Sequence, residues 1–299
     1  MTAPIALFVY NRPEHTRQTI EALRENSLAR QSDLVIFSDA PKNPKASAAV
    51  AEVREHIRTV DGFKSVTIVE REENWGLARS IISGVTLLCE KYGRAIVLED
   101  DLVSSPFFLT FMNEALDLYA GNSEVMHISG STYPVEIDER STSYFLKIPL
   151  CWGWATWDRA WSKFSKDIAV MERFTPAMIS RFNFDGTNPT YWGQLQANRD
   201  GRINTWFIFW YAHLFLTNGL ALFPKQSLLQ NIGMDGTGVP CDVNDAFFIE
   251  MTTNRIELKP LALEESASAF ERHKRYFKKL QPTILARAIN KLKRVAGVR

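Results

Sequence analysis

Short apolar runs alternate with longer amphipathic stretches over the first third of the chain. The apolar runs predict buried strands, and the stretches with apolar residues at helical spacing predict helices. The predicted strands are 4–10, 34–37, 65–69 and 95–98, and the predicted helices are 15–26, 46–59 and 77–92. Strands and helices that alternate through short links favour a mainly parallel sheet with helices on both faces. The pattern therefore predicts an α/β fold of the Rossmann-like, nucleotide-binding kind.

The pattern changes after residue 119, although no linker separates the two parts of the chain. Further elements are predicted as a helix at 107–119 and strands at 125–130, 144–147 and 220–224. Four tryptophans lie close together in one segment, at Trp152, Trp154, Trp157 and Trp161. Aromatic side chains at this density either pack in a core or form platforms for sugar rings, and the sequence leaves both interpretations open. On the second interpretation Trp152 and Trp154 bind an acceptor, and the glycine between them permits a close approach.

The composition is that of an ordinary globular protein, with 45% hydrophobic and 23% charged residues among 299. A net charge of +1 provides no field that would attract nucleic acid. The three cysteines are widely spaced, which suits a reducing compartment and lacks the spacing of a zinc site. The N-terminus lacks signal-peptide features, and no apolar run approaches the roughly 18 residues of a membrane span. We therefore expect a cytoplasmic protein that is soluble or peripheral to a membrane.

Three consecutive carboxylates, Glu99-Asp100-Asp101, end the fourth predicted strand. Adjacent acids repel one another, and their hard oxygen atoms suit Mg²⁺ or Mn²⁺, which in turn bind phosphate oxygens. A solvated acidic turn is the alternative, but ligands of open α/β sheets lie at the carboxyl ends of strands. The triplet therefore predicts a metal–diphosphate site.

Other polar residues follow strands on the same side of the predicted sheet, namely Asn11, Arg12, Asp39 and, at the start of a helix, Arg79. An arginine can bind phosphate oxygens with two donors, and an aspartate can accept from a base or a ribose. The phosphate loop of kinases, the Gly-x-Gly-x-x-Gly motif of dehydrogenases and the Gly-x-Ser-x-Gly motif of hydrolases are absent from the sequence.

These motifs resemble those of the GT-A nucleotide-sugar glycosyltransferases, above all the N-acetylglucosaminyltransferase I family and similar bacterial polysaccharide glycosyltransferases. The resemblance extends over about 4–240, and its motifs are Asn11-Arg12-Pro13, Asp39, Asn74-Trp75-Gly76 with Arg79, Val97 to Leu102, Pro106-Phe107-Phe108, the Trp-Gly-Trp segment and Asn231-Ile232-Gly233. It implies one GT-A domain over 1–270, with a donor half (1–120) and an acceptor half (121–270).

The resemblance also implies a metal-dependent reaction that moves a hexosyl or N-acetylhexosaminyl unit from a UDP-sugar to a glycan or lipid-linked saccharide, in the synthesis of surface polysaccharide. Asp101 would hold Mn²⁺ (or Mg²⁺), Asp100 would contact the ribose, and Glu99 a hydroxyl of the donor sugar. Asp39 matches the position that reads the uracil, and Arg12 the position near the diphosphate and base. Two other classes remain as alternatives, a sugar nucleotidyltransferase and a non-catalytic carbohydrate-binding protein.

The catalytic base is left open, because the sequence departs from the family at two places. The segment 205–210 has no acid where the animal enzyme has its base, and Val239-Pro240 stand where bacterial relatives often have a histidine. Asp235 is the first candidate, Asp200 the second and Asp158 the third, and the stereochemical outcome stays open with the base.

The C-terminal segment 271–299 is strongly basic, with ten Lys or Arg and no acid from residue 272 onward. Within 282–299, apolar residues fall on one helical face with basic residues around them. A helix that packs on the body of the protein would have such a face, but a helix on an anionic membrane surface would also need the basic residues, each worth about 1 kcal/mol.

Truncation after Leu280 tests this membrane hypothesis. We expect the truncated protein to lose co-sedimentation with anionic vesicles at low salt while it retains activity on a soluble acceptor, because the attraction is electrostatic and lies outside the predicted domain. If the full-length protein does not bind such vesicles, the segment has a structural role instead.

Overall fold

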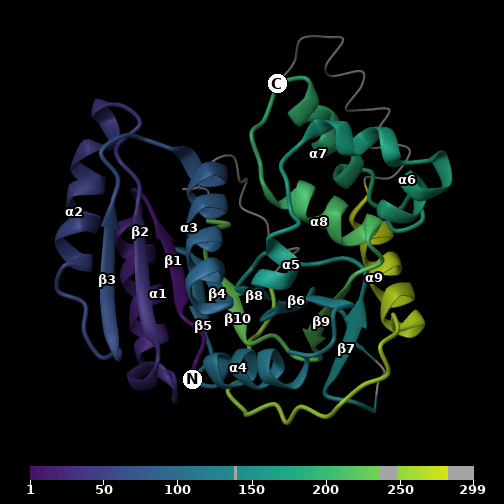
Figure 1. Cartoon of the computed structure of the whole chain (residues 1–299), viewed down its shortest axis with the longest axis horizontal. Helices are drawn as coiled ribbons and strands as arrows, with labels where there is room; N and C mark the ends of the chain where they lie inside the picture. The colour runs from purple at the N-terminus through teal and green to yellow at the C-terminus, as the bar shows by residue number, and fades with distance from the viewer. Residues whose placement is uncertain (138–139, 236–247, 282–299) are drawn as a thin grey trace.

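The computed structural model describes residues 1–137, 140–235 and 248–281, and a sheet of eight strands runs through this part of the chain (Figure 1). Its strands are β1 (Ile5–Val9), β2 (Asp33–Ser38), β3 (Ser65–Glu70), β4 (Arg94–Glu99), β6 (Val125–Ser129), β7 (Ser143–Leu146), β8 (Trp154–Trp157) and β9 (Leu220–Pro224). They are ordered β3-β2-β1-β4-β8-β6-β9-β7. The first four pair in parallel, β8 is antiparallel to β4 and β6, β9 is parallel to β6, and β7 is antiparallel to β9.

Helices cover both faces of this sheet (Figure 1). The helices are α1 (Pro13–Arg24), α2 (Ser47–Ile57), α3 (Gly76–Tyr92), α4 (Phe108–Leu118), α5 (Asp158–Trp161), α6 (Pro176–Phe182), α7 (Thr190–Arg199), α8 (Phe207–Leu216) and α9 (Ala267–Leu280), with 3-10 turns η1 (Ala29–Gln31), η2 (Pro44–Ala46) and η3 (Ile168–Arg173). Side chains of β1 alternate between the two faces. Ile5 and Leu7 belong to the core cluster that includes residues of α1, α2 and α4, whereas Ala6 and Phe8 belong to the cluster on the side of α3. The predicted α/β fold, with a mainly parallel sheet covered on both faces, is thus confirmed.

Among the elements of the second half that were not predicted from the sequence, strand β8 and helix α8 matter most for the core. Strand β8 is made from the tryptophan-rich segment, and all four of its residues are buried, so it lacks the alternation that marks a half-exposed strand. Helix α8 has six buried residues among ten and is apolar on nearly every side, so it lacks an amphipathic period. Because β8 pairs with β4 and with β6, it joins the parallel strands β1 to β4 to the rest of the sheet.

Helix α9 extends across residue 271, where the sequence analysis places the start of a separate C-terminal segment. The helix begins at Ala267, where the hydroxyl of Ser266 accepts a hydrogen bond from the amide of Ala269, and it packs beside β7 (Figure 1). Phe270, His273 and Phe277 are buried against the body, so this part of the C-terminal segment belongs to the domain. The segment 282–299 lies outside the described residues, and no described helix is both long and apolar enough to span a membrane.

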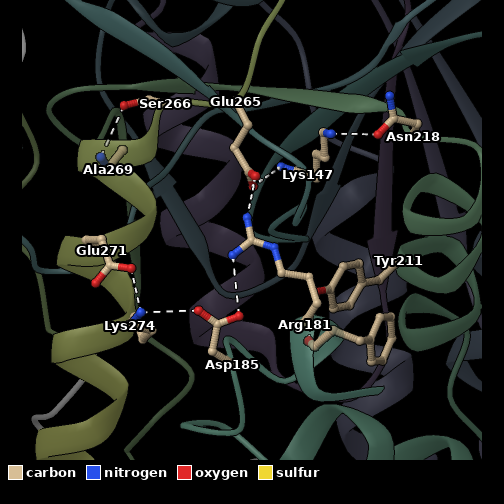
Figure 2. Close-up of polar contacts among 11 residues, drawn as sticks. Lys147, Arg181, Asp185, Tyr211, Asn218, Glu265, Ser266, Ala269, Glu271 and Lys274 are labelled. Atoms are coloured by element: carbon tan, nitrogen blue, oxygen red, sulfur yellow. Dashed lines mark hydrogen bonds and ion pairs between the residues drawn. The ribbon is translucent and has the colours of Figure 1, made fainter. Parts of the chain in front are cut away.

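A charged network fixes α9 to α6 and to the loop before α9 (Figure 2). Arg181 pairs with Glu265 and lies 3.6 Å from Asp185, and its guanidinium stacks 3.3 Å above the centre of the Phe270 ring. Lys274 pairs with the same Asp185 at 3.1 Å. The Arg181 guanidinium therefore joins α6 to α9 through the cation–π contact with Phe270, and to the loop before α9 through the salt bridge with Glu265. Two such contacts stabilise the fold more than an isolated surface ion pair does.

Replacing Arg181 with alanine should lower the free energy of unfolding by about 1 to 2 kcal/mol, because it removes both kinds of contact from a partly exposed side chain. Arg199→Ala is the matched control, since Arg199 pairs only with solvent-exposed Asp200 in the described part of the chain and should cost less than about 0.5 kcal/mol. Urea unfolding of both variants measures the difference. Equal small losses would show that α9 is held by apolar packing alone.

Candidate active site

The predicted site residues gather at one edge of the sheet because β1, β2 and β4 run parallel and end there. Arg12 follows β1 after Asn11, Asp39 follows β2, and Glu99 is the last residue of β4. Figure 1 shows the start of α3 and the strand β10 near these strand ends. The structure therefore brings together the residues that the sequence proposed for donor and metal binding.

Arg12 links the two aspartates of the acidic triplet. Its Nη2 atom lies 2.5 Å from Asp100 Oδ1 and 2.9 Å from Asp101 Oδ2. Only 6% of the Asp100 side chain is exposed, against 16% for Asp101 and 19% for Arg12, so Asp101 presents more of its carboxylate to a ligand. One guanidinium thus faces two carboxylates of the three, and the group as a whole has an excess of negative charge.

The titration of these groups reflects that excess. Burial raises the pKa of Glu99 to about 8, and the charges of Asp101 and Asp100 add to the effect. Burial also raises the pKa of Asp100 to about 6, although Arg12 opposes this shift. Burial lowers the pKa of Arg12, but the two aspartates outweigh it and leave the pKa raised. A cation bound next to these carboxylates would favour their charged forms.

The backbone of the triplet is held by a buried threonine of α1. The hydroxyl of Thr19 donates to the carbonyl of Asp100 (2.9 Å) and accepts from the amide of Leu102 (3.2 Å). The amide of Tyr10 donates to Asp100 Oδ2 at 3.3 Å. No local sequence pattern indicates this role of Thr19, because its partners lie 81 and 83 residues away in the chain.

A second segment covers the acidic turn. Strand β10 (Leu229–Asn231) pairs antiparallel with β5 (Leu102–Ser104), and the amide of Ile232 donates to the carbonyl of Asp101 at 2.9 Å. At Gly233 a β-carbon would lie 2.1 Å from Asp101 Oδ2 and 2.9 Å from Arg12 Nη1. The backbone of this glycine therefore lies directly against the Arg12–Asp101 pair, and a side chain there would displace it.

Asp235 and Asp200, the two leading candidates for the base, are placed differently. Asp235 Oδ2 lies 3.2 Å from His15 Nε2, and His15 is in the first turn of α1, close to Arg12. Asp200 directly follows α7 and pairs with Arg202 and Arg199. Hydrogen bonds from these two arginines lower the pKa of Asp200, which makes it a poor proton acceptor. The geometry favours Asp235. No local sequence pattern indicates His15, because its partner Asp235 lies 220 residues further along the chain.

Asp158, the third candidate for the base, is at the wrong end of the sheet. Its amide donates to the carbonyl of Gly93, just before β4 begins, and Trp157 is the register partner of Arg94. Glu99 lies five positions after Arg94 in β4, so the two ends of the strand are about 16 Å apart. The antiparallel direction of β8 explains this, and it was not apparent in the sequence.

Asp39 holds the start of α3. Its Oδ1 accepts from the amides of Ala40 and Trp75, and its Oδ2 accepts from the amide of Gly76 and the side chain of Asn74. These four hydrogen bonds use the roughly four acceptor positions of a carboxylate. Reading of a base by Asp39 stays a prediction, and the observed role is to fix the Asn74–Gly76 turn.

Two arginines sandwich the indole of Trp75. The guanidinium of Arg71 is 3.7 Å from the ring centre and that of Arg79 is 4.0 Å from it. Arg79, predicted from the sequence as a donor-binding residue, is exposed at this edge of the site. Arg71, which follows β3, was not predicted from the sequence.

The tryptophan-rich segment divides between the site and the core. Burial raises the pKa of the Cys151 thiol, and the charge of nearby Glu99 adds to the shift, so this end of the segment lies beside the acidic triplet. Trp152 is partly exposed there, and its role in acceptor binding stays a prediction. The close approach at Gly153 is by Leu229, whose Cδ1 would lie 2.0 Å from a β-carbon.

The assignment of Trp154 to acceptor binding is wrong. The side chain is 1% exposed, and its ring stacks on His127 at 5.3 Å and on Trp206 at 5.2 Å. His127 Nδ1 accepts from Trp210 Nε1, and burial lowers the pKa of His127 to about 3. Trp154 is the first residue of β8, which lies between β4 and β6 in the sheet, and its ring packs in the core with the aromatic residues of α8.

The donor set suits a hard divalent cation that is shared with a ligand. No cluster of three or more His, Cys, Asp or Glu side chains that could hold a metal occurs among the described residues. Mg²⁺ and similar ions are commonly bound by one or two carboxylates together with substrate phosphates. Asp101, partly exposed next to Asp100, Glu99 and one arginine, fits that arrangement.

Comparison with known proteins finds solved structures of similar fold but no protein family to which this sequence can be assigned. The sequence matches no protein-family model and no curated protein. The mannosyltransferase PcManGT from Pyrobaculum calidifontis, in complex with GDP-Man and Mn²⁺, is 14% identical, with 73% of this chain and 71% of that chain covered and a TM-score of 0.40. A protein from Bacillus anthracis described as a glucose-1-phosphate thymidylyltransferase is 11% identical (79% and 91% covered, TM-score 0.39), and mouse xyloside xylosyltransferase 1 is 12% identical (73% and 82% covered, TM-score 0.34). Likeness at these TM-scores identifies neither a family nor an activity.

Alanine at the two tryptophans separates core from site. Trp154→Ala should lower the free energy of unfolding by about 3 to 5 kcal/mol, because it empties a buried site. Trp152→Ala should cost clearly less stability, since its ring is partly exposed, and should weaken binding of a saccharide acceptor. Thermal unfolding and acceptor titration measure the two effects. A collapse of folding in Trp152→Ala would place this ring in the core as well.

Proposed function

We propose that this protein is a metal-dependent glycosyltransferase that moves a sugar from a UDP-sugar to a saccharide acceptor. The observation that carries the proposal is the Glu99-Asp100-Asp101 triplet at the carboxyl edge of the parallel strands, held by one arginine and covered by Gly233. Such an edge binds nucleotides in open α/β sheets, and the excess carboxylate charge suits a cation that carries a diphosphate.

Asp101 would hold the metal through its more exposed carboxylate, while the donor diphosphate supplies further oxygen ligands. The bound metal neutralises the charge of the leaving nucleoside diphosphate. Arg12 keeps the carboxylates of Asp100 and Asp101 in place and adds positive charge beside the diphosphate. Asp100 is nearly buried, so its carboxylate could accept a hydrogen bond only from a ligand group that reaches the carboxyl edge of the sheet, such as a ribose hydroxyl.

The donor sugar would lie between Glu99 and the tryptophan-rich segment. With a pKa of about 8, Glu99 is largely protonated at neutral pH before a cation binds, and its carboxyl group can both donate to and accept from a sugar hydroxyl. Trp152 is partly exposed, and its aromatic face would contact the acceptor sugar. The nucleoside would extend over Asn11 toward Asp39, Trp75 and Arg79 at the start of α3.

Asp235 is the proposed general base. Its carboxylate is 42% exposed, and it belongs to the segment that lies on the Arg12–Asp101 pair, so an acceptor hydroxyl could reach it beside the donor. A base that acts on the acceptor affects the rate more than the affinity for the donor. The identity of the sugar, a glycan or lipid-linked acceptor and a role in surface polysaccharide synthesis are part of the same proposal, as is peripheral attachment to a cytoplasmic membrane face through 282–299.

The two alternative classes are less well supported by the site. A sugar nucleotidyltransferase would need a glycine-rich, basic loop after β1, where this chain has Asn11-Arg12-Pro13-Glu14 at the start of α1. A carbohydrate-binding protein would need its tryptophans at the surface, but Trp154 is buried and the acidic triplet would have no role.

The test is a panel of UDP-sugars with Mn²⁺ or EDTA, with release of UDP as the signal. We expect Asp101→Asn to lower metal-dependent turnover by about 100-fold or more while the unfolding transition changes little, because it removes a charged ligand from a partly exposed position. Asp61→Asn, at a highly exposed aspartate, is the matched control.

Wild-type turnover in the Asp101→Asn variant, or equal activity of the wild type in EDTA, would overturn the metal assignment. Pyrophosphate release from UTP and a sugar 1-phosphate, without transfer from any UDP-sugar, would instead identify a nucleotidyltransferase.

A further inference from the structure

The outward face of α9 carries a row of cations that the fold holds in place. The opposite face of the helix packs on the body through Phe270, His273 and Phe277. From residue 271 to residue 279, every exposed side chain is cationic, and these are Arg272, Arg275, Lys278 and Lys279. Steps of three and four residues bring such side chains to one side of a helix, over about 10 Å of its length. We propose that this face of α9 is a docking surface for an anionic membrane.

The acids next to α9 do not neutralise this row. Asp185 pairs with Lys274 at 3.1 Å and lies 3.6 Å from Arg181, Glu265 pairs with Arg181, and Glu271 pairs with Lys274 (Figure 2). These pairs lie where α9 meets α6 and the loop before α9. None of the four outward cations pairs with an acid of the described residues. The row therefore keeps its charge for a partner outside the domain.

The charge of the whole chain is divided in the same direction. From residue 272 onward the sequence holds ten of its 35 Lys and Arg and none of its 34 Asp and Glu. The remaining 25 cations face 34 acids, so residues 1–271 have a net charge of −9 although the chain as a whole has +1. An anionic surface attracts the α9 end of such a molecule and repels the rest, which selects one orientation.

The chemistry at the end of the row favours a membrane over a nucleic acid. Leu280 directly follows Lys279, and 38% of it is exposed. The membrane interface accepts an apolar side chain among cations, whereas a phosphate backbone gains nothing from it. The negative charge of residues 1–271 would also repel a polyanion that extends beyond α9.

The docking surface lies close to the proposed acceptor side of the site. In the last turns of α9, the rings of Tyr276 and Phe277 are 6.1 Å and 4.9 Å from the ring of Tyr133. Tyr133 in turn lies 6.4 Å from the ring of Trp152. If the proposed function holds, a membrane against α9 therefore presents a lipid-linked acceptor on the side of Trp152. The docking itself does not rest on that function.

The test uses the full-length protein, because the row acts together with the basic segment 282–299. The α9 variant carries Arg272→Gln, Arg275→Gln and Lys279→Gln. The matched control carries Arg30→Gln, Lys91→Gln and Lys163→Gln, which remove the same charge from exposed positions elsewhere. All six side chains are exposed, so thermal unfolding of both variants should match wild type.

Binding is measured by co-sedimentation with phosphatidylcholine vesicles, with and without phosphatidylserine, at low salt. Each cation near an anionic surface adds about fivefold to the binding constant, so the α9 variant should bind the phosphatidylserine vesicles about 100-fold more weakly than wild type. The control variant should bind them like wild type. Neither variant nor wild type should bind vesicles of phosphatidylcholine alone.

Acetylation of lysines, read by mass spectrometry, locates the contact without any substrate. Phosphatidylserine vesicles should slow the acetylation of Lys278 and Lys279 in wild type and leave that of Lys91 and Lys163 unchanged. Unprotected Lys278 and Lys279 in vesicle-bound protein would overturn the proposal.

Three binding results would also overturn the proposal. They are equal binding of the α9 variant and wild type, an equal loss in the control variant, and binding of single-stranded DNA without binding of the vesicles. A selective loss in the α9 variant, found together with no transfer from any UDP-sugar, would support the docking surface while the proposed function fails.

Discussion

Three adjacent carboxylates at the end of a buried strand are the constraint on which the rest of this structure depends. Two unit charges about 5 Å apart at an effective dielectric constant of about 20 repel by about 3 kcal/mol, so three of them cannot all stay ionised without compensation. The chain compensates in part, with Arg12 between Asp100 and Asp101 and with proton binding by Glu99, whose pKa is about 8. The remaining excess leaves this edge of the sheet negatively charged.

The elements around this edge divide the task of holding it. Helix α1 orients the acidic turn through Thr19 and Arg12, and β10 covers it through Ile232 and Gly233. After β2, Asp39 fixes the start of α3 with four hydrogen bonds. On the other side of β4, β8 inserts antiparallel into the sheet and places most of the tryptophan-rich segment in the core.

The sequence alone predicted the strands and helices of the parallel half of the sheet, but not the arrangement of the other half. Strands β1 to β4 are short apolar runs bounded by polar turns, and their common direction places Arg12, Asp39 and Asp101 at one edge, as predicted. The direction of β8 is set by tertiary pairing, and this alone moves Asp158 to the opposite edge and Trp154 into the core. Contacts between distant segments, such as that of His15 with Asp235, leave no local pattern in the sequence.

The pairing of β10 with β5 also determines when the site can form. Asp101 and Ile232 are separated by 131 residues (232 − 101), so their hydrogen bond closes one of the longest loops in the fold. On the ribosome, the acidic turn is made first and stays uncovered until the segment 229–235 has been synthesised, roughly 7 to 26 s later at about 5 to 20 residues per second. A nascent chain that has completed strands β1 to β4 therefore exposes its carboxylates without their cover, and ligand binding can be expected only after four-fifths of the protein has been made.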